Sequence, residues 1–167
     1  MSTRKQRCLA SGLFLFYLFV LVWIILFKLS FSVQDLPHLR SVNLIPFAGS
    51  TIVNGAIQTS EILDNILIFI PFGVYLCLLK VDWPLWKKLL PIFLTSLALE
   101  LLQFLFSLGA SDITDLLGNT LGGLLGIGTF QLFSRLFQDK CRKIILSLAL
   151  VGTLLMSALI SLLIIAN

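Results

Sequence analysis

Charged residues are scarce in this chain. They make up 12% of 167 positions, whereas hydrophobic residues make up 58%. A water-soluble domain of this size could not bury so much apolar surface, so lipid must form part of the surroundings. The net charge is +4, but the basic residues lie beside apolar segments and form no patch interleaved with aromatic residues. This distribution argues against nucleic acid as a partner.

Several motifs of soluble enzymes are also missing. The sequence has no nucleophile elbow, H-E-x-x-H, P-loop or C-x-x-C, and its single histidine, His38, follows Pro37 in a loop. The three scattered cysteines argue against a disulfide framework or a cysteine metal site. The absence of these motifs argues against common classes of hydrolase and nucleotide-binding protein. Chemistry carried by carboxylate side chains remains open.

Long uncharged runs are what the sequence does have. The longest covers residues 8–27, which is about the length of a helix that crosses the hydrocarbon core. The run is too long for a signal peptide and lacks an A-x-A-like exit, so we expect it to be retained. The predicted fold is all-α, a polytopic transmembrane helical bundle of about five spans in a single membrane domain, residues 1–167. The spans are expected near 8–28, 61–79, 89–108, 115–134 and 144–166, with a Pro- and Gly-containing outer loop at 29–60.

The basic residues predict an orientation. With the N-terminus in the cytoplasm, ten of the 12 Lys and Arg residues fall in cytoplasmic segments, and only Lys28 and Arg40 fall outside. Positively charged short loops stay on the cytoplasmic side, so this arrangement is favoured. The C-terminal Asn167 is then extracytoplasmic, and most acidic residues lie outside or within spans.

The third predicted span has a polar face. Ser96, Glu100, Gln103 and Ser107 are spaced i, i+4, i+7 and i+11, which places them on one side of a helix. Glu100 then lies roughly 10 Å below the outer end. A carboxyl at that depth must be neutral, paired or wetted, so it should face the bundle interior. A structural Glu bonded to a neighbouring helix is the simpler alternative.

The next link brings two further carboxyls to a helix entrance. Asp112 and Asp115 are followed by Asn119, which shares a face with Asp115. Ser111, Asp112 and Thr114 are candidate N-caps, and acidic side chains are favoured at a helix N-terminus. For Asp112 alone, helix capping is as good an explanation as a functional role. For Asp112, Asp115 and Asn119 together, capping is the poorer explanation.

Two features of the spans are expected to be structural. Gly118, Gly122 and Gly126 form a small-xxx-small ridge that permits close helix approach, within the chain or in a homodimer. Pro71 lacks a backbone N–H and should kink its helix, which leaves the carbonyl of Leu67 as a spare acceptor.

The polar residues of three spans therefore collect in the outer half of the membrane. Arg40 is the obvious counter-ion. The candidate ligand-binding residues are Arg40, Glu61, Asp64, Asn65, Glu100, Gln103, Asp112, Asp115 and Asn119. They could hold a divalent ion, form an acid/base pair with Glu100, Asp112 and Asp115 as the candidate catalytic groups, or accept a polar headgroup. Spacing does not choose among these, and no cofactor is required.

The polar motifs resemble those of the VanZ-like family. They are NLIPF at 43–47, DNILIFIPFG at 64–73, ELLQF at 100–104 and DITDLLGNTLGGLLG at 112–126. The resemblance adds Asn43 to the candidate binding residues. It implies a multi-pass protein of the bacterial plasma membrane, associated with low-level resistance to teicoplanin, a glycopeptide with a fatty-acyl tail, by a mechanism that is not established.

Three function classes remain open. The leading hypothesis is a non-enzymatic resistance factor whose outer polar pocket engages a lipid headgroup or the lipoglycopeptide drug. The enzyme alternative is a membrane-embedded hydrolase or transferase acting on a lipid or a lipid-linked cell-wall precursor. A small proton-coupled transporter is the third, and the lack of visible repeats disfavours it.

Overall fold

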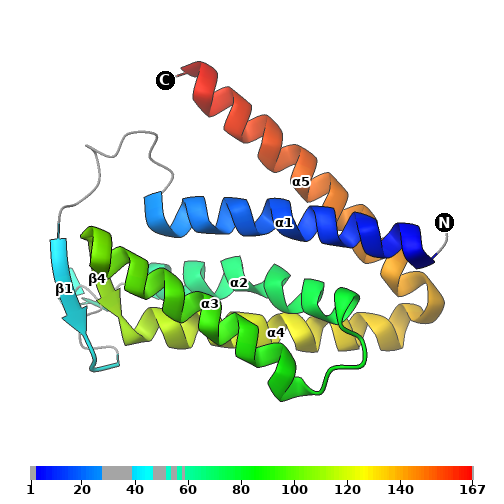
Figure 1. Ribbon diagram of the computed structural model, residues 1–167, viewed down its shortest axis with the longest axis horizontal. Coiled ribbons are helices and arrows are strands. Elements are labelled where there is room, and N and C mark those ends of the chain that lie inside the picture. Colours follow the sequence, from blue (N-terminus) through cyan, green and yellow to red (C-terminus); the bar gives the residue numbers. More distant parts are fainter. Residues whose placement is uncertain (1–2, 28–38, 47–51, 54–55, 58, 167) are drawn as a thin grey trace.

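The chain forms a bundle of helices with small β-strands at one end (Figure 1). The computed structural model describes residues 3–27, 39–46, 52–53, 56–57 and 59–166. In chain order the elements are α1 (Thr3–Phe27), β1 (Leu39–Asn43), β2 (Ile52–Val53), β3 (Ala56–Ile57), α2 (Thr59–Leu79), α3 (Leu85–Phe106), β4 (Leu108–Asp112), α4 (Ile113–Phe137), η2 (Gln138–Lys140) and α5 (Cys141–Ala166).

The prediction of an all-α membrane bundle with about five spans is confirmed. Within the described residues, four segments are long and apolar enough to cross a membrane, and the last of them, Ile113–Ile165, contains α4 and all but the final residue of α5. Each predicted span therefore lies in a helix of its own. Helices α1 and α5 begin three to five residues earlier than predicted, at Thr3 and Cys141, because a helix continues into its charged flank beyond the apolar run.

The strands were not predicted. β1 pairs in parallel with β4, with Leu39 opposite Leu108 and Asn43 opposite Asp112, while β2 and β3 form a short antiparallel pair. The expectation of plain loop at 39–43 and helix or link at 108–112 is therefore wrong. Backbone groups with little access to water must pair with one another, and a pair this far apart in sequence leaves no local signal.

The end of α3 also differs from the prediction. The helix stops at Phe106, and Ser107 adopts a left-handed conformation with a φ of 54°. Ser107 therefore does not belong to the polar helical face that the sequence predicted. The turn at this residue redirects the chain from α3 into β4, which sets the position of Asp112.

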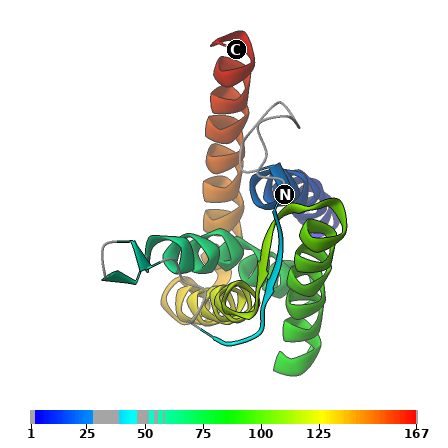
Figure 2. The same cartoon turned by 90° about the vertical axis from the view of Figure 1, so that its left-hand side faces the viewer.

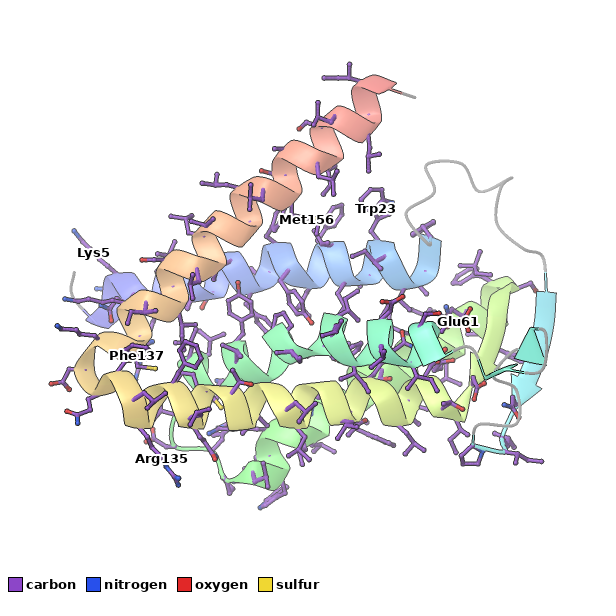
Figure 3. The ribbon with its side chains drawn as sticks, turned by 180° about the vertical axis from the view of Figure 1, so that it is seen from behind. Lys5, Trp23, Glu61, Arg135, Phe137 and Met156 are labelled. Atoms are coloured by element: carbon purple, nitrogen blue, oxygen red, sulfur yellow. The ribbon has the colours of Figure 1, made fainter. Side chains whose placement is uncertain are left out.

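The charged residues separate along the bundle. Figure 3 shows Lys5 and Arg135 at one end and Glu61 at the other, on the side of the strands. The basic first turns of α1, the connection between α2 and α3 and the segment around η2 share the first end, here called the basic end. This separation is what the predicted orientation requires, with β1 and β4 at the opposite end.

Helices α2 and α4 pack with almost no side chain between them. A Cβ added to Gly122 or Gly126 would run into the carbonyl oxygen of Ile66 or Ile70, and one added to Gly73 would run into that of Gly123. The prediction that the glycine ridge permits close helix approach is confirmed, and the partner helix lies within the same chain. This close contact fixes the N-terminal turns of α2 and α4 beside each other.

Pro71 lies inside α2, which continues to Leu79. The hydroxyl of Tyr17 in α1 donates a hydrogen bond of 2.7 Å to the carbonyl of Ile68. In the described contacts, the carbonyl that accepts a hydrogen bond from another helix is therefore that of Ile68. The sequence predicted a spare acceptor one residue earlier, at Leu67.

Two apolar clusters hold the bundle together. One connects α1, α2, α3 and α4 through residues such as Leu21, Phe69 and Ile127. The other lies nearer the basic end, where Leu13 and Leu78 pack on the start of α5 around Ile145. Beyond that contact α5 leans away from the other helices, as Figure 2 shows.

Candidate functional site

Asp112 joins four parts of the chain at the strand end of the bundle. It is the last residue of β4 and the N-cap of α4, where its Oδ1 accepts from the backbone N–H of Thr114 at 2.7 Å. Its Oδ2 accepts from Nδ2 of Asn43 in β1 at 3.0 Å. Of the three candidate caps, the structure selects Asp112, and the same carboxyl also holds the two strands in register.

Glu100 reaches the same junction from α3. Its Oε2 accepts from the backbone N–H of Asp112 at 3.1 Å, and its carbonyl oxygen accepts from the Ser111 hydroxyl at 2.7 Å. The residue is 7% exposed, so it faces the bundle interior, as its depth predicted. Asp115 follows Asp112 by one helical turn at the start of α4, so its carboxyl lies at the same end of the bundle.

Asp115 accepts a hydrogen bond from a residue of α2. Asn65 donates to its Oδ1 through Nδ2 at 2.7 Å. The close packing of Gly118 against Asn65 brings these two helices near enough for the contact. These residues form what we call the carboxyl–amide cluster: Asn43, Asn65, Glu100, Asp112 and Asp115.

Further polar contacts lie one helical turn from the cluster on α3 and α4. Asn119 donates to the Ser96 hydroxyl at 2.9 Å, and both residues are almost fully buried. Gln103 donates to the carbonyl of Ile25 at 3.0 Å, which satisfies one of the unpaired carbonyls in the last turn of α1. Among the described residues, the buried Oδ1 of Asn119 and Oε1 of Gln103 accept no hydrogen bond.

Other candidate residues lie apart from the cluster. Glu61 and Asp64 are exposed on the first turns of α2, and neither makes a hydrogen bond to the cluster within the described part of the chain. For Arg40 the structure describes the backbone in β1 but not the side chain. The predicted counter-ion role of Arg40 therefore depends on a side chain that the structure does not describe. His38 also lies outside the described residues.

The pairing partners are what sequence reasoning missed. Helical phase placed Ser96 and Glu100 on one face, but it could not show that Ser96 meets Asn119 or that Asn65 meets Asp115. Each of these pairs joins two different helices, and the only sequence signal for them was a shared depth in the membrane.

The arrangement is rich in hydrogen-bond acceptors. Three carboxyl groups lie at one end of the bundle, and among the described residues the amide oxygens of Gln103 and Asn119, one turn away on α3 and α4, accept no hydrogen bond. Within the part of the chain that the structure describes, no group of three His, Cys, Asp or Glu side chains has the geometry to hold a metal ion. Such a site suits a group that presents N–H or O–H donors or a positive charge.

Fold and site together define a polytopic helical membrane protein with an acceptor-rich polar cluster at the end opposite its basic loops. The sequence model of the VanZ/LLP1 family matches residues 14–138. The chain is also 36% identical over 157 residues to Protein VanZ of Enterococcus faecium, an alignment that covers 92% of each chain. The chain therefore belongs to the VanZ/LLP1 family. No solved structure gives a significant match.

Proposed function

We propose that this protein lowers the susceptibility of a bacterium to teicoplanin, and that the carboxyl–amide cluster engages a lipid headgroup or the drug at the outer leaflet. Membership of the family to which Protein VanZ belongs supports the resistance role. The orientation expected from the basic residues places the cluster at the outer surface, where a glycopeptide acts.

One observation supports the site above all others: Glu100, Asp112 and Asp115 converge from α3, β4 and α4. Acids at membrane depth are costly, and amide N–H groups from three elements donate to these carboxyls. A bound ammonium, amine or array of hydroxyl groups would find several acceptors already oriented. Binding of that group would keep the drug away from its target in the cell wall.

The test uses a teicoplanin-susceptible bacterium that expresses the full chain. The chain should raise the minimal inhibitory concentration of teicoplanin, and Glu100→Gln, Asp112→Asn and Asp115→Asn should return it to the empty-vector value. Asp139→Asn is the matched control, because Asp139 is an exposed acid in η2 at the basic end. If all three cluster variants reached the membrane in normal amounts and kept full resistance, the site assignment would be wrong.

The same cells distinguish binding from catalysis. Mass profiles of membrane lipids and lipid-linked wall precursors should be identical with and without the protein. A new lipid or precursor species that disappears in Glu100→Gln would instead establish the hydrolase or transferase alternative, with Glu100 as its acid/base.

A further inference from the structure

An apolar groove lies between α1, α2, α4 and α5, with a volume of about 390 Å³. Its walls come from α1 around Tyr17, α2 around Pro71 and Val74, α4 around Phe130, and one face of α5 as far as Met156. The groove therefore lies closer to the basic end than to the carboxyl–amide cluster. Its volume falls within the range of about 300 to 1,000 Å³ that is usual for ligand sites.

The lining offers little to a polar ligand. The Tyr17 hydroxyl already donates to Ile68, and the Thr129 hydroxyl donates to Leu125 in its own helix at 2.8 Å. Most of the remaining lining is aromatic or aliphatic, including Phe133. A hydrocarbon chain fits this lining because it needs no hydrogen bond.

Helix α5 diverges from α1 towards its C-terminal end (Figure 1). Figure 3 shows Met156 of α5 and Trp23 of α1 in the wedge between these helices. Farther along α5, Leu159 and Leu163 continue the face that lines the groove, three and seven residues after Met156, and are 50% and 36% exposed. In a membrane these side chains face hydrocarbon, so lipid chains have lateral access to the groove.

Arg142 places a positive charge on the basic-end side of the groove. Arg142 is spaced i, i+3 and i+7 with Ile145 and Ala149, two lining residues, and so shares their face of α5. Its Nη2 donates to the carbonyl of Leu78 at 3.0 Å, in the last turn of α2. Within the described residues its buried Nε has no hydrogen-bond partner. The guanidinium is thus fixed one helical turn from the groove, and in the described contacts only Nη2 is engaged, which leaves Nη1 to bind a ligand.

We propose that this groove binds an anionic phospholipid, with one acyl chain along the wedge between α1 and α5 and the phosphate at Arg142. The apolar lining accepts the chain, and guanidinium binds phosphate through paired, charge-assisted hydrogen bonds. The lipid is thereby selected by charge as well as by its tail. This site lies in the opposite half of the molecule from the carboxyl–amide cluster and is independent of the function proposed there.

The experiment uses the full chain in lipid nanodiscs that contain phosphatidylglycerol with a photoreactive diazirine in its acyl chain. Mass spectrometry should locate the adducts on groove residues such as Phe133 and Met156. Phosphatidylglycerol should label the groove about tenfold more than phosphatidylcholine with the same chain, because both carry a phosphate but the choline cation of the second is repelled by Arg142. Adducts spread evenly over all lipid-facing helices would overturn the proposal.

Two variants separate the tail from the headgroup. Among the described atoms none lies within 4 Å of a Cβ added to Gly152, so Gly152→Leu should fill the groove, leave the fold intact and remove the adducts. Arg142→Gln should keep the adducts but abolish the preference for phosphatidylglycerol. Groove labelling that is unchanged in Gly152→Leu would contradict the proposal.

Matched controls exist for both variants. Gly12 of α1 is equally open among the described atoms and lies outside the groove, so Gly12→Leu should label as the wild type does. Lys143 is the exposed neighbour of Arg142, and Lys143→Gln should retain the lipid preference. A dimer that dissociates in Gly152→Leu would assign the groove to a second copy of the chain and would also overturn the proposal.

Discussion

At the scale of single residues, the main feature is the pairing of carboxyl groups with neutral amide donors. Asn43 donates to Asp112, Asn65 donates to Asp115, and the backbone of Asp112 donates to Glu100. Each contact joins two separate elements and offsets part of the cost of placing an acid in an apolar surrounding. The acids therefore serve the fold as well as any ligand.

The dual role of Asp112 can be tested by two substitutions. Asp112→Ala removes the cap of α4 and leaves Asn43 without its acceptor, which should lower stability by about 1 to 3 kcal/mol. Asp112→Asn keeps a capping oxygen and should cost less. A thiol-reactive dye measures the melting temperature in detergent through the buried Cys77 and Cys141, with the exposed Cys8 replaced by Ser. Equal melting temperatures for both variants would contradict the capping role.

At the scale of helices, the glycines of α4 determine which partner helix it can approach. Gly122 and Gly126 lie against the backbone of α2, so the contact depends on the absence of side chains rather than on interlocking ones. That contact in turn positions Asn65 beside Asp115. The sequence showed the ridge, but its partner could equally have been a second copy of the chain.

A comparison along α4 tests this packing. Gly122→Ala and Gly126→Ala should each destabilise the protein by about 1 to 3 kcal/mol, because the added methyl meets a carbonyl oxygen of α2. Gly128→Ala is the matched control on the same helix, since no described atom lies within 4 Å of its added Cβ. It should be neutral or slightly stabilising because Ala favours helix more than Gly does. The thermal assay in detergent ranks the three variants, and equal effects at Gly122 and Gly128 would argue against close α2–α4 contact.

At the scale of the whole molecule, the separation of charge along the bundle is the dominant feature. Lys5 and Arg135 lie at one end, and Glu61 lies at the other (Figure 3). Short basic loops resist translocation, so the basic end should face the cytoplasm and the carboxyl–amide cluster should face outward.

Cysteine labelling checks this orientation. In a background in which Cys8, Cys77 and Cys141 are replaced by Ser, Ile45→Cys should react with a membrane-impermeant maleimide on intact cells. Ile45 is 67% exposed, at the end of the bundle where β1 lies. Gln138→Cys at the basic end should react only after lysis, and the reverse pattern would overturn the orientation.

The position of the C-terminus is a separate prediction. With the N-terminus inside and five spans, the end of α5 should be extracytoplasmic. Alkaline phosphatase fused after Asn167 should therefore be active, because the enzyme folds only outside the cytoplasm, while the same fusion after Gln138 should be inactive. Activity of the Gln138 fusion alone would place α5 or the whole chain the other way round.

The sequence by itself determined the helices and the depth of their polar residues. Apolar runs of membrane length and the distribution of Lys and Arg are local properties, and the cost of burying charge in hydrocarbon leaves few alternatives. The prediction that Glu100 faces the interior followed from that cost alone.

Only the tertiary structure decided which residues meet. The β1–β4 pairing, the Asn65–Asp115 and Ser96–Asn119 contacts, and the groove beside Arg142 each join segments from different parts of the chain. Contacts of this kind depend on helix crossing and rotation, which many sequences of the same hydrophobicity would satisfy differently. Their energy comes from close packing, and no local pattern in the sequence records it.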